Sequence, residues 1–253
     1  MAAWDSLRVD IGRLRNDIET LSKIGRSPEG ALTRHAFSPS YEEARRWLKG
    51  RMAEARIDAR DDAAGNTIGR VGAPAGPCVM SGSHIDTVPD GGPLDGAFGV
   101  LSALECARVI KESGITPPRG FEAVAFIDEE GRFLDCMGSK AIAGTLIEDE
   151  LAKAKDPNGG MLTDAMKGAG FDLSRIREAK RKKGEIAAYV ELHIEQGPVL
   201  ESKKLPIGVV QGIVGINHSD ITFYGEPDHA GTTPMDLRKD AFTGACEFVY
   251  KMR

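Results

Sequence analysis

Long apolar runs are missing from this chain of 253 residues. No stretch approaches the roughly 20 apolar residues of a membrane-spanning helix, and the first residues, MAAWDSLRVD, lack the apolar segment of a signal peptide. A basic excess is missing too, because 33 Lys and Arg stand against 38 Asp and Glu, which gives a net charge of −5. Nucleic acids and anionic membranes bind basic surfaces, so the sequence predicts neither as a partner.

Paired cysteines are also missing. The four cysteines are widely spaced and form no CxxC motif; they are Cys78, Cys106, Cys136 and Cys246. Such a set predicts free thiols in a reducing compartment, and we therefore expect a cytoplasmic protein. What the chain does contain is 41% hydrophobic and 28% charged residues, the balance of a globular protein with a sizeable core.

Hydrophobic spacing predicts alternating helices and strands. Apolar residues at helical spacing indicate helices over 5–24, 40–56 and 95–113. The second of these is expected to begin at Ser40, because Glu43 follows at the spacing of a capping box. Short strands are expected around the turn at Gly65 and Asn66, and buried strands over 77–84, 121–128 and 187–194. Strands separated by helices predict an α/β fold with a mainly parallel central sheet flanked by helices.

The pattern changes after about residue 212. A two-faced strand is expected over 216–226 and a helix over 237–253, and the sequence stops without a residue that would end this helix. We therefore expect two domains, residues 1–212 and residues 213–253. The second is expected to be the incomplete beginning of an α+β domain.

A lysine-rich stretch over 172–183 contains the run EAKRKK. Such a run is typical either of a nucleic-acid site or of a solvated helix face. Its acidic neighbours favour the solvated face.

The densest cluster of polar residues is GSHIDTVPDGGPLDGAFGV. His84 closes a predicted strand, Asp86 follows two residues later, and Asp95 stands where a glycine-rich loop enters a helix. Open α/β sheets bind ligands at such strand ends. The His84 imidazole could bind a metal, Asp95 could bridge two cations, and Asp86 suits the role of orienting the imidazole. A His-x-Asp pair is also common without any metal, so this cluster alone leaves both interpretations open.

Two further strand ends carry residues of the same kind. The segment FIDEEGRF places Asp128, Glu129 and Glu130 in a row, and adjacent carboxylates at a buried strand end are unfavourable without a cation. Strand neighbours point to opposite sides, so one glutamate would bind metal and the other would act as a general base; a solvated acidic turn is the alternative. The segment ELHIEQGP brings His193 and Gln196 to a third strand end. Three such ends favour a nitrogen and oxygen site for zinc, manganese, cobalt or nickel.

A fourth cluster, GEPDHAGTTPMDLRKDA, lies in the expected second domain. It places His229 in a loop between a predicted strand and a predicted helix. The side chain is equally compatible with a ligand contact and with a loop histidine bonded to its own turn.

Together these motifs resemble the carbamoylase branch of the metal-dependent aminoacylase/carboxypeptidase clan. This branch contains N-carbamoyl-L-amino acid hydrolases, beta-ureidopropionases and allantoate amidohydrolases. The likeness covers nearly the whole chain, and GSHIDTVPDGG, ELHIEQGP and DHAGTTPM carry it. The wider clan has a carboxylate at the position of His193, so the histidine points to the carbamoylase branch.

The resemblance implies two divalent metal ions, Zn²⁺ or else Mn²⁺, Co²⁺ or Ni²⁺. His84, Asp95 and His193 would surround one ion. Asp95 would bridge to a second ion that Glu130 also holds. The domain of residues 1–212 would then be a zinc-aminopeptidase-like catalytic domain.

The resemblance also implies a reaction. The protein would cleave the ureido C–N bond of N-carbamoyl-L-amino acids or allantoate with metal-activated water, with Glu129 as general base and Asp86 orienting His84. Gln196 and His229 look like substrate contacts. His229 would reach the substrate from a lid and dimerisation domain that begins at residue 213, across the interface of a homodimer.

The chain departs from the family pattern in two places. The stretch between Glu130 and Gly138 is one or two residues shorter than usual, and the sequence stops at Arg253, before the family's last histidine ligand and its substrate-carboxylate arginine. We therefore expect a truncated chain. The alternatives to a carbamoylase are an aminoacylase or dipeptidase of the same clan, and an inactive truncated chain.

Overall fold

The computed structural model describes residues 3–215 and 217–252 of the chain. The chain divides into two compact units, Met1–Gly197 and Pro198–Arg253. The division between the units precedes the predicted domain boundary at residue 212. The assignment of a catalytic and a lid domain stays a prediction.

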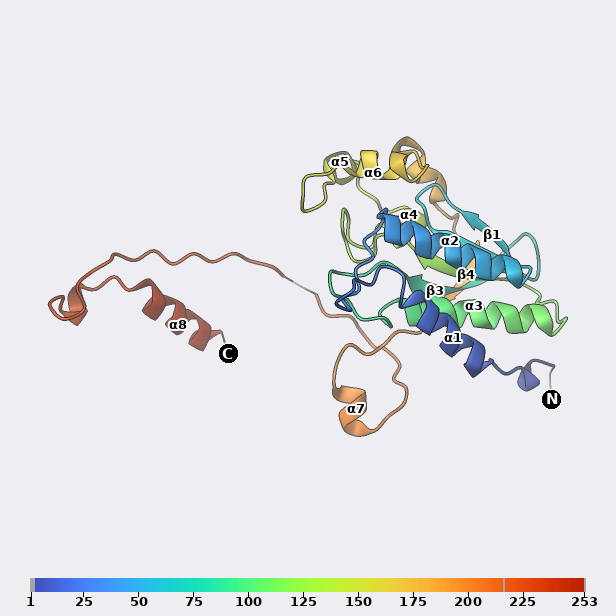
Figure 1. Ribbon diagram of the computed structural model, residues 1–253, viewed down its shortest axis with the longest axis horizontal. Helices are drawn as coiled ribbons and strands as arrows, with labels where there is room; N and C mark the ends of the chain where they lie inside the picture. Colours follow the sequence, from blue (N-terminus) through green and yellow to red (C-terminus); the bar gives the residue numbers. More distant parts are fainter. Residues whose placement is uncertain (1–2, 216, 253) are drawn as a thin grey trace. The chain divides into compact units, whose positions relative to one another are not determined.

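The first unit is built on a five-stranded sheet (Figure 1). Its strands are β1 (Asp58–Asp61), β2 (Thr67–Val71), β3 (Cys78–His84), β4 (Gly120–Phe126) and β5 (Ile186–Val190), in the order β1-β2-β4-β3-β5. β3 pairs in parallel with both β4 and β5, whereas β2 pairs antiparallel with β1 and β4. The α/β prediction is confirmed, and the sheet is mixed, with its parallel part formed by the three strands that were predicted to be buried.

Helices surround this sheet. They are α1 (Ile11–Leu21), α2 (Pro39–Glu54), α3 (Ala97–Glu112), α4 (Met137–Ala143), α5 (Glu148–Lys153) and α6 (Leu162–Gly168), with 3-10 turns η1 (Ala3–Ser6) and η2 (Leu173–Ala179). The predicted start of the second helix at Ser40 is wrong by one residue. The helix starts at Pro39, whose fixed φ suits a first helical position, and Ser38 provides the N-cap by accepting from the Tyr41 amide.

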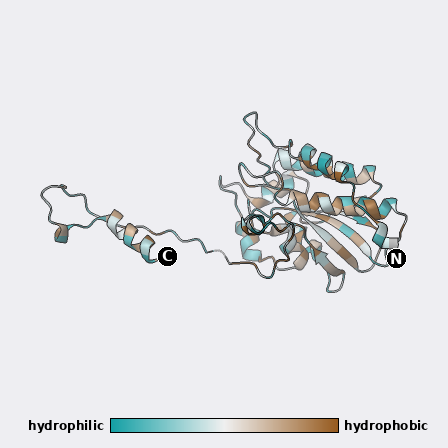
Figure 2. Cartoon of the chain, turned by 90° about the horizontal axis from the view of Figure 1, so that it is seen from below, coloured by the Kyte–Doolittle hydropathy of each residue, from teal (hydrophilic) through white to brown (hydrophobic). Residues whose placement is uncertain are grey.

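Two hydrophobic clusters cover the faces of the sheet. Neighbouring residues of β4 point to opposite faces, so Ala123 belongs to the larger cluster, together with Leu48 of α2 and Leu104 of α3. Val124 and Phe126 point to the smaller cluster. Figure 2 shows hydrophobic residues along the strands and on the helices beside them. The sheet is therefore buried thickly on the face that carries α2 and α3.

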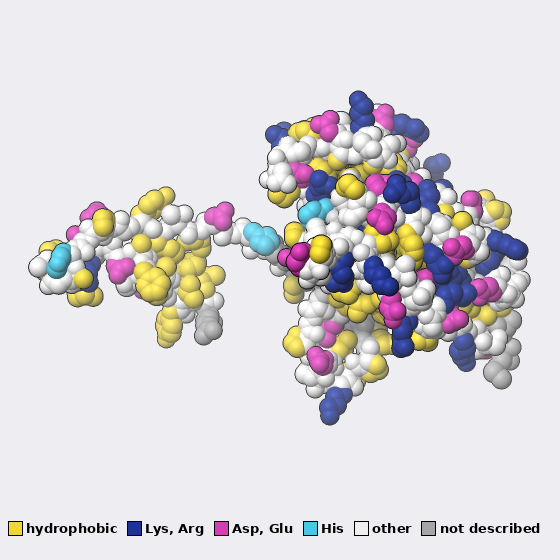
Figure 3. Space-filling model, in the orientation of Figure 1, with side chains coloured by type: hydrophobic (Ala, Val, Ile, Leu, Met, Phe, Trp, Pro, Cys, Tyr) yellow, Lys and Arg dark blue, Asp and Glu magenta, His cyan; other side chains and the backbone are white. Residues whose placement is uncertain are grey.

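The second unit contains α7 (Val199–Lys203), the 3-10 turn η3 (Met235–Leu237) and α8 (Ala241–Lys251). The strand predicted over 216–226 is wrong for residues 217–226, which form no strand, while residue 216 lies outside the described residues. A strand needs a hydrogen-bonded neighbouring strand, and none of the described strands pairs with this segment. Its apolar side chains stay exposed, Tyr224 at 90%, and hydrophobic side chains gather on this unit in Figure 3.

None of the helices in the described parts of the chain combines the length and the apolar character that crossing a membrane requires.

A buried ion network joins α1 to α3. Asp17, Glu105 and Arg108 are each at most 2% exposed. The Arg108 guanidinium lies 2.5 Å from an Asp17 oxygen and 3.4 Å from a Glu105 oxygen. Arg13 and Arg51, nearer the surface, complete the pairing of the two carboxylates. Arg108 is thus the shared cation between two buried anions.

Arg108→Ala should lower the free energy of unfolding by about 3–5 kcal/mol, because it leaves two buried carboxylates short of a partner. Urea unfolding followed by circular dichroism measures the change. Arg175→Ala is the matched control, since Arg175 forms an exposed ion pair with Glu178 and should leave stability unchanged. Equal urea midpoints for the two variants would contradict a stabilising role of the network.

Candidate metal centre

The predicted site residues of the first unit lie after the ends of its parallel strands. His84 is the last residue of β3, Glu129 and Glu130 follow β4, and His193 follows β5. The carboxyl ends of parallel neighbours meet at the same edge of a sheet, so these side chains converge. β5 is shorter than the predicted strand over 187–194, and its prediction as buried is wrong. It is an edge strand that pairs only with β3 among the described strands, and it is largely exposed.

His84 presents a nitrogen lone pair to the carboxylates around it. Its Nδ1 lies 3.0 Å from the main-chain oxygen of Asp86, which can only accept, so Nδ1 carries the hydrogen. Its Nε2 lies 3.4 Å from Oε2 of Glu129 and 4.0 Å from Oδ1 of Asp95. The orienting contact at Nδ1 therefore comes from the Asp86 carbonyl, while an oxygen of the Asp86 carboxylate lies 3.7 Å away.

His193 is oriented in the same way. Its Nδ1 donates to the main-chain oxygen of Ile194 at 2.9 Å, which leaves Nε2 as the lone-pair atom, 3.3 Å from Oδ1 of Asp95. Its ring stacks near that of His84 with centroids 6.2 Å apart. The other oxygen of Asp95 accepts from Gln196 Nε2 at 2.8 Å. Two imidazole lone pairs thus face one carboxylate oxygen.

The ligand atoms form two overlapping groups, each within 4.8 Å. One is His84, Asp95 and His193, and the other is His84, Glu129 and Glu130. The first matches the expected ligands of one ion. Glu130 is grouped with His84 and Glu129 rather than with Asp95, its expected partner on the second ion.

Three buried oxygens suit a cation. Oδ1 of Asp86, Oδ1 of Asp95 and Oε1 of Glu130 accept no hydrogen bond from any described residue. Buried acceptors without a donor are unfavourable, and lone pairs that face one another repel unless a proton or a cation lies between them. Imidazole nitrogen and carboxylate oxygen are ligands of zinc and related divalent ions. The residues present therefore fit a divalent metal.

Burial makes these groups hard to ionise without a cation. It raises the pKa of Asp86 to about 7, although the carboxylate accepts from the Glu130 amide at 3.0 Å. Burial, with repulsion from Asp95 and Glu129, also raises the pKa of Glu130. Burial lowers the pKa of His84, but Asp86 and Glu129 outweigh it and the net shift is upward. The field at this edge of the sheet is thus strongly attractive to positive charge.

Asp128 supports the loop that presents the two glutamates, a role that the sequence did not reveal. It is fully buried, has a positive φ of 53°, and accepts from the amides of Phe133 and Leu134 at 3.1 and 2.9 Å. Burial raises its pKa to about 6. A left-handed aspartate whose side chain bonds nearby amides is a turn signal, but three consecutive acidic residues do not tell which of them forms the turn.

Arg34 supports the loop after β3, and the sequence did not indicate this either. Its side chain is buried and donates to the main-chain oxygens of Ile85 and Ile24 at 2.5 and 2.9 Å. Its amide donates to Oγ1 of Thr87, and its carbonyl accepts from the Thr87 amide. The residues around Asp86 are therefore fixed by a segment more than 50 residues earlier in the chain.

His229 belongs to the second unit. Its Nδ1 accepts from the amide of Gly231 at 3.1 Å, which is the local turn contact that the sequence left open. The other seven predicted site residues all lie in the first unit; they are His84, Asp86, Asp95, Glu129, Glu130, His193 and Gln196.

Residues 80–251 match the family described as Peptidase family M20/M25/M40. An N-carbamoyl-L-amino acid amidohydrolase of Geobacillus stearothermophilus is 42% identical over 94% of this chain and 59% of that protein. An allantoate amidohydrolase of Escherichia coli (strain K12) is 43% identical over 89% of this chain and 56% of that protein. A crystal structure of an amidase of the hydantoinase/carbamoylase family from Burkholderia phymatum has a TM-score of 0.80 and 38% identity, over 97% of this chain and 60% of that one. The chain thus spans less than two thirds of these relatives.

Gly96→Ala should weaken divalent-metal binding about 10- to 100-fold, because the added methyl group displaces the ring of His84, a proposed metal ligand. A Cβ at residue 96 would meet ring atoms of His84 at 2.3–2.5 Å. Gly114→Ala is the matched control, since Gly114 also has a positive φ but its Cβ would meet nothing within 4 Å. Titration with Co²⁺, followed by its visible absorption, gives the affinities. Equal Co²⁺ affinities for both variants would contradict His84 as a ligand.

Proposed function

Since the chain belongs to Peptidase family M20/M25/M40, we propose that it forms the metal-binding part of an amidohydrolase. The substrates are N-carbamoyl-L-amino acids or allantoate, and the reaction cleaves the ureido C–N bond. The observation that carries the proposal is the facing of Nε2 of His84 and Nε2 of His193 toward Oδ1 of Asp95. Relatives with this likeness carry the names of amidohydrolases of these two substrates.

The proposed ligands follow the chemistry of the donor atoms. His84, Asp95 and His193 would hold one divalent ion, and Asp95 and Glu130 would hold a second; zinc is the first choice, and manganese, cobalt or nickel the others. Such ions polarise the substrate carbonyl and lower the pKa of a water molecule. The orphaned oxygens of Asp95 and Glu130 support this assignment.

Glu129 is the proposed general base. Its side chain is 38% exposed, so water and substrate can reach it, and its Oε2 lies 3.4 Å from Nε2 of His84. It takes a proton from the attacking water and returns it to the leaving nitrogen. The carbonyl of Asp86 accepts a hydrogen bond from His84, and its carboxylate accepts one from the Glu130 amide. Asp86 therefore positions His84 and Glu130, the two residues beside Glu129.

Gln196 and His229 are the proposed substrate contacts. Gln196 uses its Nε2 on Asp95, which leaves its carbonyl oxygen for a ureido N–H. His229 belongs to the proposed lid and dimerisation domain over residues 213–253, which would form a homodimer, while residues 1–212 form the catalytic domain. The four free thiols support the cytoplasm as the location.

Substrate choice tests the proposal against its alternative. The second candidate is an aminoacylase or dipeptidase, which the peptidase description of the family favours. Metal-loaded protein is incubated with an N-carbamoyl-L-amino acid, allantoate, an N-acetyl amino acid and a dipeptide, and products are followed by chromatography and ammonia release. Turnover of only the first two supports the proposal. Turnover of only the last two replaces it with the alternative, and metal binding without any turnover contradicts catalysis by this chain.

Glu129→Gln should retain bound metal and lower kcat about 10²- to 10⁴-fold, because the amide cannot take a proton. Glu130→Gln should instead lower the metal content. Elemental analysis and kcat measured on the same samples separate the two roles, with the exposed Glu178→Gln as control. Metal loss in the Glu129 variant and retention in the Glu130 variant would mean that the two assignments are exchanged.

A further inference from the structure

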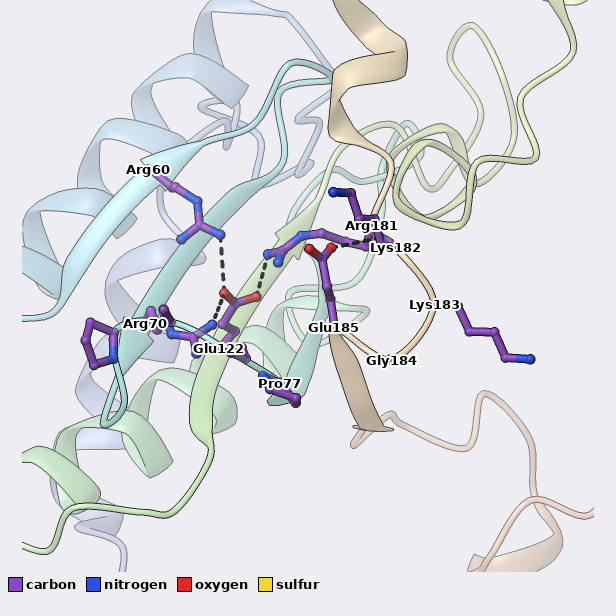
Figure 4. A pocket seen from close by; sticks show the side chains of 12 residues that line it. Arg60, Arg70, Pro77, Glu122, Arg181, Lys182, Lys183, Gly184 and Glu185 are labelled. Atoms are coloured by element: carbon purple, nitrogen blue, oxygen red, sulfur yellow. Dashed lines mark hydrogen bonds and ion pairs between the residues drawn. The ribbon is translucent and has the colours of Figure 1, made fainter.

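A second charged cluster lies near the start of β4, away from the candidate metal centre. Its core is Glu122, which is fully buried. Three guanidinium groups bind the Glu122 carboxylate: Arg60 of β1 at 3.2 Å, Arg70 of β2 at 3.0 Å and Arg181 at 2.6 Å (Figure 4). Burial alone would raise the pKa of Glu122, but the arginines outweigh it and lower the pKa, so the carboxylate is ionised.

Positive charge in this cluster exceeds negative charge. The cluster lines a cavity of about 520 Å³, which Lys182, Lys183 and Glu185 also border. The lining residues therefore comprise five cations and two carboxylates, in a chain whose net charge is −5. A concave surface with cationic walls concentrates anions.

Two of the arginines keep free hydrogen-bond donors. Arg70 is engaged, because it also donates to the main-chain oxygens of Ala73 and Gly76. The side chains of Arg60 and Arg181 each make one hydrogen bond to a described residue, to the buried carboxylate. A guanidinium has five N–H donors in a planar fork that fits the oxygens of phosphate. Arg60 is also accessible, with 45% of its side chain exposed.

The cavity is separate from the metal centre within the first unit. Glu122 lies opposite Met80 in the parallel pairing of β4 with β3, four residues before His84. The segment of Lys182 to Glu185 directly precedes β5, so the cavity borders the amino ends of strands whose carboxyl ends carry the metal ligands.

We propose that this cavity is an anion site that binds the dianionic phosphate group, either as free phosphate or as a small phosphomonoester. The anion accepts hydrogen bonds from the unused N–H groups of Arg60 and Arg181. Binding joins the turn before β5 to β1, and it therefore stabilises the folded protein.

Thermal unfolding with inorganic phosphate tests the site. The chain is titrated at constant ionic strength with chloride as balancing anion, and with EDTA present so that metal-bound phosphate does not contribute. The Tm of the unaltered chain should rise with phosphate, in proportion to the logarithm of its concentration once that exceeds the dissociation constant. Arg60→Ala should weaken the apparent affinity about tenfold or more, while Arg175→Ala, which removes an equal charge outside the cavity, should leave it unchanged. A Tm that phosphate leaves unchanged, or equal affinity in both variants, overturns the proposal.

Glu122→Gln should change phosphate affinity in the opposite direction to Arg60→Ala. It removes the anion that competes for the arginines and keeps nearly the same volume, so phosphate affinity should rise severalfold. Circular dichroism establishes whether this variant folds, and the Arg60 comparison decides the proposal if it does not. Unchanged or weaker binding by folded Glu122→Gln overturns it.

Glycerol 3-phosphate in the same titration distinguishes the two forms of the ligand. Equal Tm shifts with glycerol 3-phosphate and phosphate support a phosphomonoester, and a shift with phosphate alone supports the free ion.

Discussion

Two imidazole lone pairs face one carboxylate oxygen of Asp95, and the rest of the candidate site depends on this electrostatic conflict. Glu129 adds a further oxygen close to Nε2 of His84. Burial makes several ionised carboxylates unfavourable here, and it raises the pKa values of Asp86 and Glu130. A proton relieves one contact at a time, whereas a divalent cation relieves several together.

The surrounding structure keeps these groups from moving apart. A Cβ at Gly96 would meet ring atoms of His84 at 2.3–2.5 Å, and a Cβ at Gly99 would meet the carbonyl oxygen of Leu192, the residue before His193, at 2.4 Å. Arg34 fixes the loop after β3 from the other side. Since supports on three segments hold the donors in place, the helices and strands of the first unit act as a rigid frame for a preorganised site.

The parallel strands also separate two opposite charge environments. Carboxylates dominate where the strands end, while cations dominate where β3 and β5 begin. Glu122 neutralises only part of that positive charge, and it lies on the face of β4 that carries the smaller hydrophobic cluster. Because the sheet backbone lies between them, the carboxylate end can attract cations while the cationic end attracts anions.

The sequence by itself determined the α/β class, the approximate strands and the proximity of His84, Asp95 and His193, because alternation and strand-end motifs are local properties. It did not determine that the Asp86 carbonyl orients His84, or that Asp128 forms the turn beside the glutamates. It also failed for the strand over 216–226 and for the burial of β5. Hydrogen-bond partners, edge positions and burial depend on segments far apart in the chain, so only the tertiary structure decided them.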